Sequence, residues 1–458
     1  MKKHAPTRFL ALGLSAALMT GLLSGCRFGF ASDPDDPNAV EVVEPIDMSV
    51  DTFEYDPSLS GTSITLLNSK AEIQTALVEM AAACEGKSGV HVEIMPGTDG
   101  DSPYTKVVSL YNSGNPPTLS ILDTTDVIAL AEEKAADLSD QPWIAEAEGY
   151  VTQINGKVYS FPLCIEGRGI IYHKEVIEET LGESFDPSTI RTQDDFVALL
   201  DRLVAAGMEH PVSLAMEDWS LGAHHLQYIY ETYDGTSDGA AECINLIKDG
   251  QLDLTTYDRM SQFLDMFDIL KKYNVAYRDP LGADYDEMAI DLADGKTAFW
   301  FNGNWAWPDL AEADAEEDDE YGFLPYFMNN DPDDFVNQQI QASPSKQIML
   351  DGIVATEKEQ AAAKEFLNWI VFSEIGQQML VKTCKIIPPF QNNPYEPSDP
   401  LSRDIYSRVH EGKAFNASAI VPNDHWSVLG AALQKYLADR SDRAELIDSI
   451  VAYWDEQQ

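Results

Sequence analysis

From Thr62 the chain alternates between strand-like and helix-like hydrophobic periods, and this alternation most strongly limits the fold. A short apolar run comes first, a segment with apolar residues at helical spacing follows, and a segment of alternating apolar and polar residues comes third. These segments are Ser63–Leu67, Ile73–Lys87 and Val90–Ile94. The order predicts a βαβ unit, and its continuation along the chain predicts an α/β protein with largely parallel sheets.

Turn and capping residues place the following elements. Asn155-Gly156 between two short apolar segments predicts a hairpin. A strand over Thr118–Leu122 is followed by Asp126, which we expect to cap the next helix. Thr192 with Asp195 resembles a capping box. The spacing of apolar residues predicts further helices over 174–181, 196–206, 254–273, 357–372, 426–437 and 444–454.

The first 25 residues have the features of an export signal. Lys2, Lys3 and Arg8 precede an apolar run, Phe9–Leu23, which is short for a membrane span. The sequence Leu-Ser-Gly-Cys that ends at Cys26 resembles the bacterial lipoprotein box. This resemblance implies cleavage after residue 25 and a lipid on Cys26.

Residues 26–61 predict a flexible tether. Nine acidic and no basic residues lie between Ala31 and Asp56, and prolines interrupt the segment. Such segments repel themselves and stay extended. We expect the folded body to begin at Thr62.

The charge excludes some partners. The chain of 458 residues has 30 Lys and Arg against 77 Asp and Glu, a net charge of -47. Because the leader holds three basic and no acidic residues, cleavage would leave 27 basic against 77 acidic residues, a net charge of -50. Such a surface repels nucleic acid and disfavours anionic ligands. The length fits two to three domains, and a hydrophobic content of 44% can supply their cores.

The cysteines do not predict a zinc site, because no CxxC or Cys/His ligand spacing occurs. After lipidation of Cys26, four remain, and they allow three complete pairings: Cys84, Cys164, Cys243 and Cys384. Cys84 lies on the apolar face of its predicted helix, so we expect it to be a buried free thiol. We expect no metal and no cofactor.

Four sequence segments, in the same order along the chain, resemble the carbohydrate-binding family of bacterial extracellular solute-binding proteins that includes maltose-binding protein. His173 departs from the family pattern, in which Asn is usual. The matching segments are NGKVYSFP at 155–162 with GIIYHK at 169–174, DGKTAF at 294–299 with NGNWAW at 302–307, AKEFLNW at 363–369, and SEIG at 373–376.

The resemblance implies a two-lobed α/β fold in which hinge crossings join discontinuous lobes around a ligand cleft. It places one lobe at 62–165 plus 323–396 and the other at 167–322 plus 399–458. It implies a monomer on the outer face of the cytoplasmic membrane, in an envelope of Gram-positive type. The protein would capture a carbohydrate, expected to be an oligosaccharide, and deliver it to a separate ABC transporter permease without catalysis.

A sugar ring has apolar faces and polar edges, so its site needs aromatic rings together with carboxylates and amides. Trp219, Trp305 and Trp426 lie at positions that resemble the stacking aromatics of the family. Three other tryptophans are assigned to core packing instead: Trp307, Trp369 and Trp454.

The polar candidates follow strands or adjoin these aromatics. Glu166 resembles a hinge carboxylate of the family, and Arg168 is expected either to donate to a sugar hydroxyl or to pair with Glu166. His224 and His225 lack a third ligand at metal spacing, so surface or cleft-edge positions are expected. The remaining candidates are Asn68, Ser69, Lys70, Asp123, Thr124, Asp126 and Glu217.

Two other functions stay open at this point. The large negative charge is compatible with the same fold binding a cation such as a polyamine. A secreted glycoside hydrolase also needs tryptophans and paired carboxylates. Among 77 acidic residues a pair carries no information, and the sequence has no Gly-x-Ser-x-Gly, His-Glu-x-x-His or phosphate-binding loop motif.

Overall fold

The structure is a computed structural model that describes residues 46, 51–97, 102–147 and 149–457. The predicted leader, Cys26 and most of the predicted tether lie outside the described residues. No helix within the described ranges is long and apolar enough to cross a bilayer.

The C-terminal end of the predicted tether is packed on the folded body. Phe53 and Tyr55 lie against a hydrophobic core, and Leu59 is buried in it. The Ser373 hydroxyl donates to the Asp51 carboxylate at 3.1 Å. The prediction of a flexible tether up to Gly61 is therefore wrong for residues 51–61, because aromatic side chains among the acidic residues find apolar neighbours.

In the described part of the chain, nine strands form one sheet of mixed direction, in the order β2-β1-β3-β10-β6-β8-β7, with β11 on β10 and β9 on β6. The prediction of a largely parallel sheet is confirmed for β1, β2 and β3 and is wrong at the centre. The strands are β1 (Ser63–Asn68), β2 (His91–Pro96), β3 (Leu119–Asp123), β4 (Gln153–Ile154), β5 (Lys157–Val158), β6 (Ser160–His173), β7 (Val212–Ser213), β8 (Phe299–Gly303), β9 (Tyr321–Leu324), β10 (Ile340–Leu350) and β11 (Ala414–Phe415).

β4 and β5 form the predicted hairpin as a separate two-stranded sheet. Both turn residues are left-handed, with φ of 51° at Asn155 and 77° at Gly156. Asn and Gly tolerate this conformation best, which is why the dipeptide predicted the turn.

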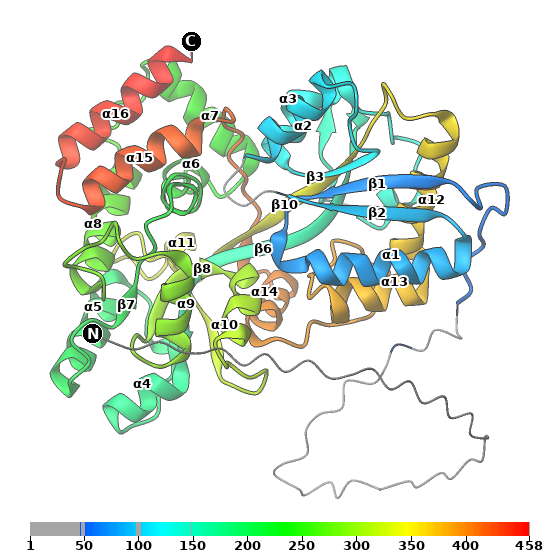
Figure 1. Cartoon of the computed structure of the whole chain (residues 1–458). Coiled ribbons are helices and arrows are strands. Elements are labelled where there is room, and N and C mark those ends of the chain that lie inside the picture. The colour runs from blue at the N-terminus through cyan, green and yellow to red at the C-terminus, as the bar shows by residue number, and fades with distance from the viewer. Residues whose placement is uncertain (1–45, 47–50, 98–101, 148, 458) are drawn as a thin grey trace, which may run out of the picture. The chain divides into compact units, whose positions relative to one another are not determined.

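The long strands β6 and β10 lie side by side in the middle of the sheet and run antiparallel (Figure 1). β3 pairs with one end of β10, whereas β8 and β9 pair with the far end of β6. Two groups of strands that are distant in the sequence are thus joined by two continuous strands.

Most predicted helices are present with bounds shifted by a few residues. Asp126 does not cap its helix, because α3 begins earlier and Asp126 lies in its first turn. The helices are α1 (Gln74–Ser88), α2 (Pro103–Asn112), α3 (Thr124–Lys134), α4 (Lys174–Leu181), α5 (Gln193–Ala206), α6 (Tyr228–Glu231), α7 (Ser237–Lys248), α8 (Asp258–Tyr273), α9 (Tyr285–Ala293), α10 (Trp307–Glu312), α11 (Phe335–Gln338), α12 (Glu357–Phe372), α13 (Glu374–Gln378), α14 (Pro400–His410), α15 (His425–Leu437) and α16 (Arg443–Glu456).

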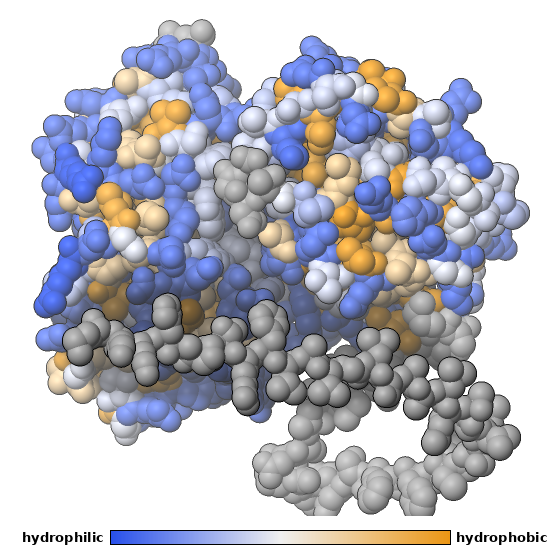
Figure 2. All heavy atoms as spheres, in the orientation of Figure 1, coloured by the Kyte–Doolittle hydropathy of each residue, from blue (hydrophilic) through white to orange (hydrophobic). Residues whose placement is uncertain are grey.

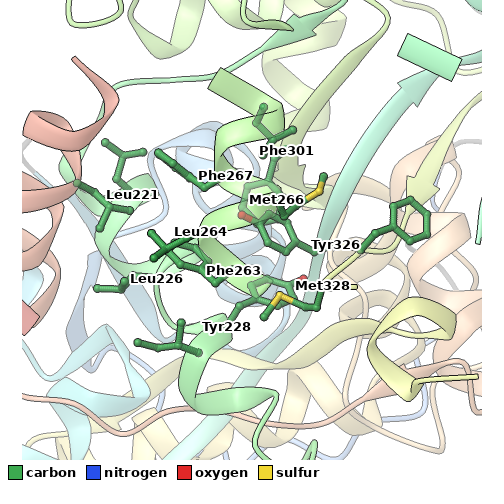
Figure 3. Packing of buried hydrophobic residues seen from close by; sticks show 14 of the residues in the cluster. Leu221, Leu226, Tyr228, Phe263, Leu264, Met266, Phe267, Phe301, Tyr326 and Met328 are labelled. Carbon is green, nitrogen blue, oxygen red and sulfur yellow. The ribbon is translucent and has the colours of Figure 1, made fainter. Parts of the chain in front are cut away.

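Two large hydrophobic clusters form the principal cores. One draws its residues from positions 59–164 and 348–390, and the other from positions 170–336 and 415–454. In the second, Phe263 and Phe267 of α8 pack with Tyr228, Phe301 and Tyr326 (Figure 3). Burial of such aromatic and aliphatic surface is the main favourable term in folding.

The surface is mainly polar. On the face shown in Figure 2, hydrophilic residues predominate and apolar residues form small groups. The four cysteines described by the structure are buried free thiols, which confirms the expectation for Cys84.

Candidate functional site

Three aromatic side chains stand in a row and are only partly buried. The His224 ring lies between Trp305, with ring centroids 4.6 Å apart, and Trp219, at 5.3 Å. Tyr285 extends the row beyond Trp219 at 5.5 Å. The rings are inclined to one another by 47° to 74°, so each half-buried ring offers its own apolar surface to a ligand.

Local backbone features hold these rings in place. Trp219 directly precedes η4 (Ser220–His225), a π-helical segment that carries His224. Trp305 lies in a short turn directly after β8. A Cβ atom on Gly303 would stand 2.1 Å from the Trp305 ring, so only glycine allows the ring to fold back over the strand end.

The third predicted aromatic, Trp426, lies half-buried in the first turn of α15. α15 packs closely against η4, since a Cβ atom on Gly222 would meet the Trp426 carbonyl oxygen at 2.3 Å. Asn423, just before this helix, donates a hydrogen bond to the Asp126 carboxylate on α3. Trp426 thus lies three positions after a residue that contacts Asp126.

A buried charge cluster adjoins the aromatic row. The Lys70 ammonium contacts the Glu166 carboxylate and lies 2.6 Å from Glu72. Ser345 donates a second hydrogen bond to Glu166. Lys70, Glu72 and Glu166 line one pocket together with Trp305. The structure therefore brings together residues that the sequence places more than 200 positions apart.

The pKa values in this cluster follow from burial and ion pairing. Burial alone would raise the pKa of Glu166, but Lys70 and the hydrogen bonds lower it below its ordinary value. Burial alone would lower the pKa of Lys70, but Glu166 and Glu72 raise it. Both groups stay charged, and Asn68 fixes the loop by accepting from the Lys70 amide at 2.8 Å.

The junction of β3 and α3 supplies the next polar group. Asp123 accepts from Lys346 at 2.6 Å, and Thr124 donates to the Pro344 carbonyl at 3.4 Å. Burial and the charge of Asp123 raise the pKa of Asp126 to about 7. One Asp126 carboxylate oxygen is buried without a hydrogen-bond partner in the described structure.

Glu217 contributes a second buried acceptor near Trp219. One of its oxygens accepts from the Tyr285 amide at 2.8 Å, and the other has no partner within the described residues. Burial raises the pKa of this carboxyl. The Ser69 hydroxyl, after β1, and His224 Nδ1 are also buried and have no hydrogen-bond partner among the described residues. Buried polar atoms without partners are uncommon in proteins, and a bound ligand can satisfy them.

Arg168 does not pair with Glu166. Its guanidinium forms an ion pair with Glu231 and donates to Gln341 at 2.6 Å and to the His224 carbonyl at 3.1 Å. Of the two alternatives raised by the sequence, pairing with Glu166 is thus wrong, because Glu231 is the nearer carboxylate.

Sequence reasoning missed some members of this region. His224 and His225 were both expected at the surface or the edge of the cleft. The His224 ring is part of the aromatic row, and the expectation is wrong for His225, which is buried against Phe267 and Phe301. Burial, followed by the charges of Arg168 and Lys346, lowers the pKa of His224 well below the ordinary value, so this ring is neutral. Tyr285, Lys346 and Asn423 carried no local signal, because their roles depend on contacts distant in sequence. No group of His, Cys, Asp or Glu in the described ranges could hold a metal ion.

Comparison with known proteins gives partial sequence matches and strong structural ones. The multiple sugar-binding protein of Streptococcus mutans is 29% identical over 165 residues, or 35% of this chain. The match spans only 37% of that relative's length.

Among solved structures, the solute-binding protein RafE in complex with raffinose has a TM-score of 0.69 at 16% identity, over 86% of this chain and 99% of that one. A chitin oligosaccharide binding protein has a TM-score of 0.67 at 20% identity, over 86% and 98% of the two chains. These matches show that the chain has the two-lobed α/β fold of solute-binding proteins.

The family model for bacterial extracellular solute-binding proteins matches residues 79–404. This range covers well over half of the chain and includes β3, β6, β8 and β10, from which or next to which most of the site residues project. The chain therefore belongs to the family of bacterial extracellular solute-binding proteins.

Proposed function

We propose that the protein binds a neutral carbohydrate, an oligosaccharide, at the row formed by Trp219, His224 and Trp305. The observation that carries the proposal is this half-buried row beside the buried, unpartnered oxygen of Glu217, which accepts from the Tyr285 amide through its other oxygen. Aromatic rings fit the apolar faces of sugar rings, and carboxylate oxygens accept from their hydroxyls. The names of the relatives support the same class, since they include raffinose and chitin oligosaccharide.

Binding closes the cleft in this proposal. The predicted lobes are 62–165 plus 323–396 and 167–322 plus 399–458. Two separate hydrophobic clusters support two lobes, but residues 324–336 pack in the cluster of the second lobe, so we assign them to that lobe. Sugar contacts made only in the closed form shift the protein toward it. A shift from 1:99 to 99:1 needs about 5.5 kcal/mol of differential binding.

The protein acts as a monomer that delivers its ligand to a separate ABC permease, with no catalytic step. A lipid on Cys26 anchors it at the outer face of the membrane. Replacing Cys26 with Ser should release the protein into the soluble fraction without changing sugar affinity. Retention of a leader-cleaved Cys26→Ser protein on the membrane would contradict the anchor.

A ligand panel tests the binding proposal. Raffinose, chitin oligosaccharides, maltotriose, spermidine and a neutral peptide are titrated against tryptophan fluorescence and by calorimetry, with sugar products assayed in parallel. Saturable binding of one or more oligosaccharides without hydrolysis is expected. Sugar hydrolysis, or binding of spermidine alone, would contradict the proposal.

Spermidine is in the panel because of a specific feature of the cleft. The carboxyls of Asp126 and Glu217 form no salt bridge in the described part of the chain, and burial raises the pKa of each. A cationic ligand would keep such carboxyls ionised, whereas a neutral sugar leaves them free to accept or donate hydrogen bonds. The aromatic row favours the sugar.

A further inference from the structure

Arg168 joins four segments of the chain beneath the aromatic row. It projects from β6, donates to the carbonyl of His224 in η4 and to Gln341 in β10, and pairs with Glu231 in α6. Its guanidinium also lies 5.0 Å from the centre of the Tyr228 ring. The side chains of Arg168 and Glu231 are 8% and 1% exposed, so the ion pair is out of contact with bulk water.

Such a buried ion pair is a poor source of stability. Removing two charges from water costs as much as, or more than, their attraction returns, and well-packed apolar residues often stabilise a protein equally well. The planar guanidinium does, however, fix several partners at defined angles. We therefore infer that the ion pair fixes the relative positions of the segments that Arg168 contacts.

One of these segments is the π-helical turn η4, which Arg168 contacts through the His224 carbonyl. Its apolar residue Leu221 and the following Leu226 point into the core near Phe263 and Phe267 (Figure 3). The Leu226 amide closes the turn on the Leu221 carbonyl at 3.0 Å. Arg168 holds the turn at the position between them, through the main chain of His224.

We propose that Arg168 is a positioning residue of the ligand site: it fixes η4 so that the His224 ring stands between Trp219 and Trp305. Arg168 acts through the His224 carbonyl, and its donors face the protein. The consequence for affinity rests on the proposed sugar-binding function. The consequence for the rings is independent of any ligand.

The chain contains a matched control for this arginine. Arg259 pairs with Asp334 at 2.6 Å, donates through Nε to the Thr232 carbonyl at 3.0 Å and through Nη1 to Gln262 at 3.0 Å. Its guanidinium lies 5.6 Å from the Phe335 ring. It therefore makes the same kinds of contact at a place where no aromatic of the row is touched.

The test compares Arg168→Met/Glu231→Gln with Arg259→Met/Asp334→Asn. Each double variant removes both charges and keeps a carbonyl oxygen in place of the carboxylate. Both proteins carry 5-fluorotryptophan, and the resonances of Trp219 and Trp305 are assigned with Trp219→Phe and Trp305→Phe. Fluorine spectra without ligand, melting temperatures, and affinity for the best sugar of the panel are measured. Arg168→Lys serves if the Arg168 double variant does not fold, because one ammonium cannot reach all three acceptors.

In the Arg168 variant we expect shifted or broadened resonances of Trp219 and Trp305 and an affinity reduced about tenfold, equivalent to 1.4 kcal/mol. The Arg259 variant should leave both readouts unchanged, even if it melts lower. Unchanged resonances in a folded Arg168 variant, or equal changes in the Arg259 variant, would overturn the inference. If the parent binds no sugar, the proposed function fails, and the fluorine spectra still decide whether Arg168 positions the rings.

Discussion

The tryptophans of this protein fall into two groups that differ in their surroundings. Five are at most 3% exposed and belong to the cores: Trp143, Trp300, Trp307, Trp369 and Trp454. The others, Trp219, Trp305 and Trp426, are half-buried. Trp369 stacks on Phe366 within an apolar cluster, whereas Trp305 contacts His224 and shares a pocket with Lys70 and Glu166.

This difference separates packing from binding. A core tryptophan has already gained its hydrophobic free energy when the chain folds. A half-buried tryptophan beside charged groups can gain more apolar contact when a ligand covers it. The two groups should therefore respond to truncation in opposite ways, and the following experiments measure that contrast from its largest effect to its smallest.

Replacing Trp369 with Ala should reduce the free energy of unfolding by about 3 to 5 kcal/mol, because it leaves a large cavity in a core. Urea denaturation measures this loss. Sugar affinity of the folded variant should match that of the parent. If this variant loses affinity at a temperature where it is fully folded, the division into core and cleft tryptophans is wrong.

Replacing Trp305 with Ala should cost about 2 to 4 kcal/mol of binding free energy, as for aromatic anchors that become buried at interfaces. The melting temperature without ligand should change little, since the ring is only half-buried. Calorimetric titration with the best sugar of the panel, beside Trp369→Ala, gives the comparison directly. Parent-like affinity would remove Trp305 from the site.

The buried carboxyl of Asp126 allows a test of the polar site residues, through the dependence of stability on pH. The pKa of this carboxyl is raised from 3.8 to about 7, so the unfolded chain releases the proton first as pH rises. The stability of the parent should therefore fall between about pH 4 and pH 7 and level off above it. Asp126→Asn should remove this dependence and stabilise the protein by on the order of 2 kcal/mol at pH 8.

Melting curves from pH 4 to pH 8 measure this effect. Replacing the exposed Asp448 on α16 with Asn is the control and should leave the profile of the parent unchanged. An Asp126→Asn profile as steep as that of the parent would show that other groups cause the dependence.

Replacing Trp219 with Phe should have the smallest effect, about 0.5 to 1.5 kcal/mol of binding free energy. Phe keeps a flat ring next to His224 but presents less surface. Calorimetric titration of Trp219→Phe and Trp219→Ala shows whether the affinity depends on the area of the side chain or on the presence of an aromatic ring. A loss from Phe as large as that from Ala would point to the indole N–H as the important contact.

Local sequence signals predicted local structure well. α4 and α12 have the bounds that the helical period gave, and the Asn155-Gly156 turn forms where it was expected. β6 was harder, because Pro162 and Gly167 interrupt its pattern and only pairing with β10, about 180 residues away, keeps it continuous. Periodicity describes neighbours in the sequence and carries no information on such pairing.

The residues of the candidate site likewise fall into those that the sequence identified and those whose contacts it could not predict. Trp305 and Glu166 were found through resemblance and Lys70 through its position after the first strand, and the structure places all three around one pocket. Arg168 was noticed, but Glu231 was not identified as its partner, since nothing in the residues between them links β6 to α6. His224 could have been suspected from the aromatic residues on either side of it in the sequence, but its contacts with Trp219 and Trp305 depend on the π-helical turn.

The continuous strands β6 and β10 affect how this protein unfolds. β6 contributes Phe161 and Ile170 to the two large clusters, whereas β10 contributes Ile348 to one of them and Ile340 to a third cluster that also contains Trp300 and Phe323. If one half of the sheet unfolds, the other half loses the backbone hydrogen bonds that β6 and β10 make across both halves. Heating should therefore produce one cooperative calorimetric transition, and fragments cut within β6 should not fold separately. Because β6 and β10 join the two halves as paired strands, any relative motion of the halves has to bend these strands. We expect such bending to be elastic and to meet a restoring force.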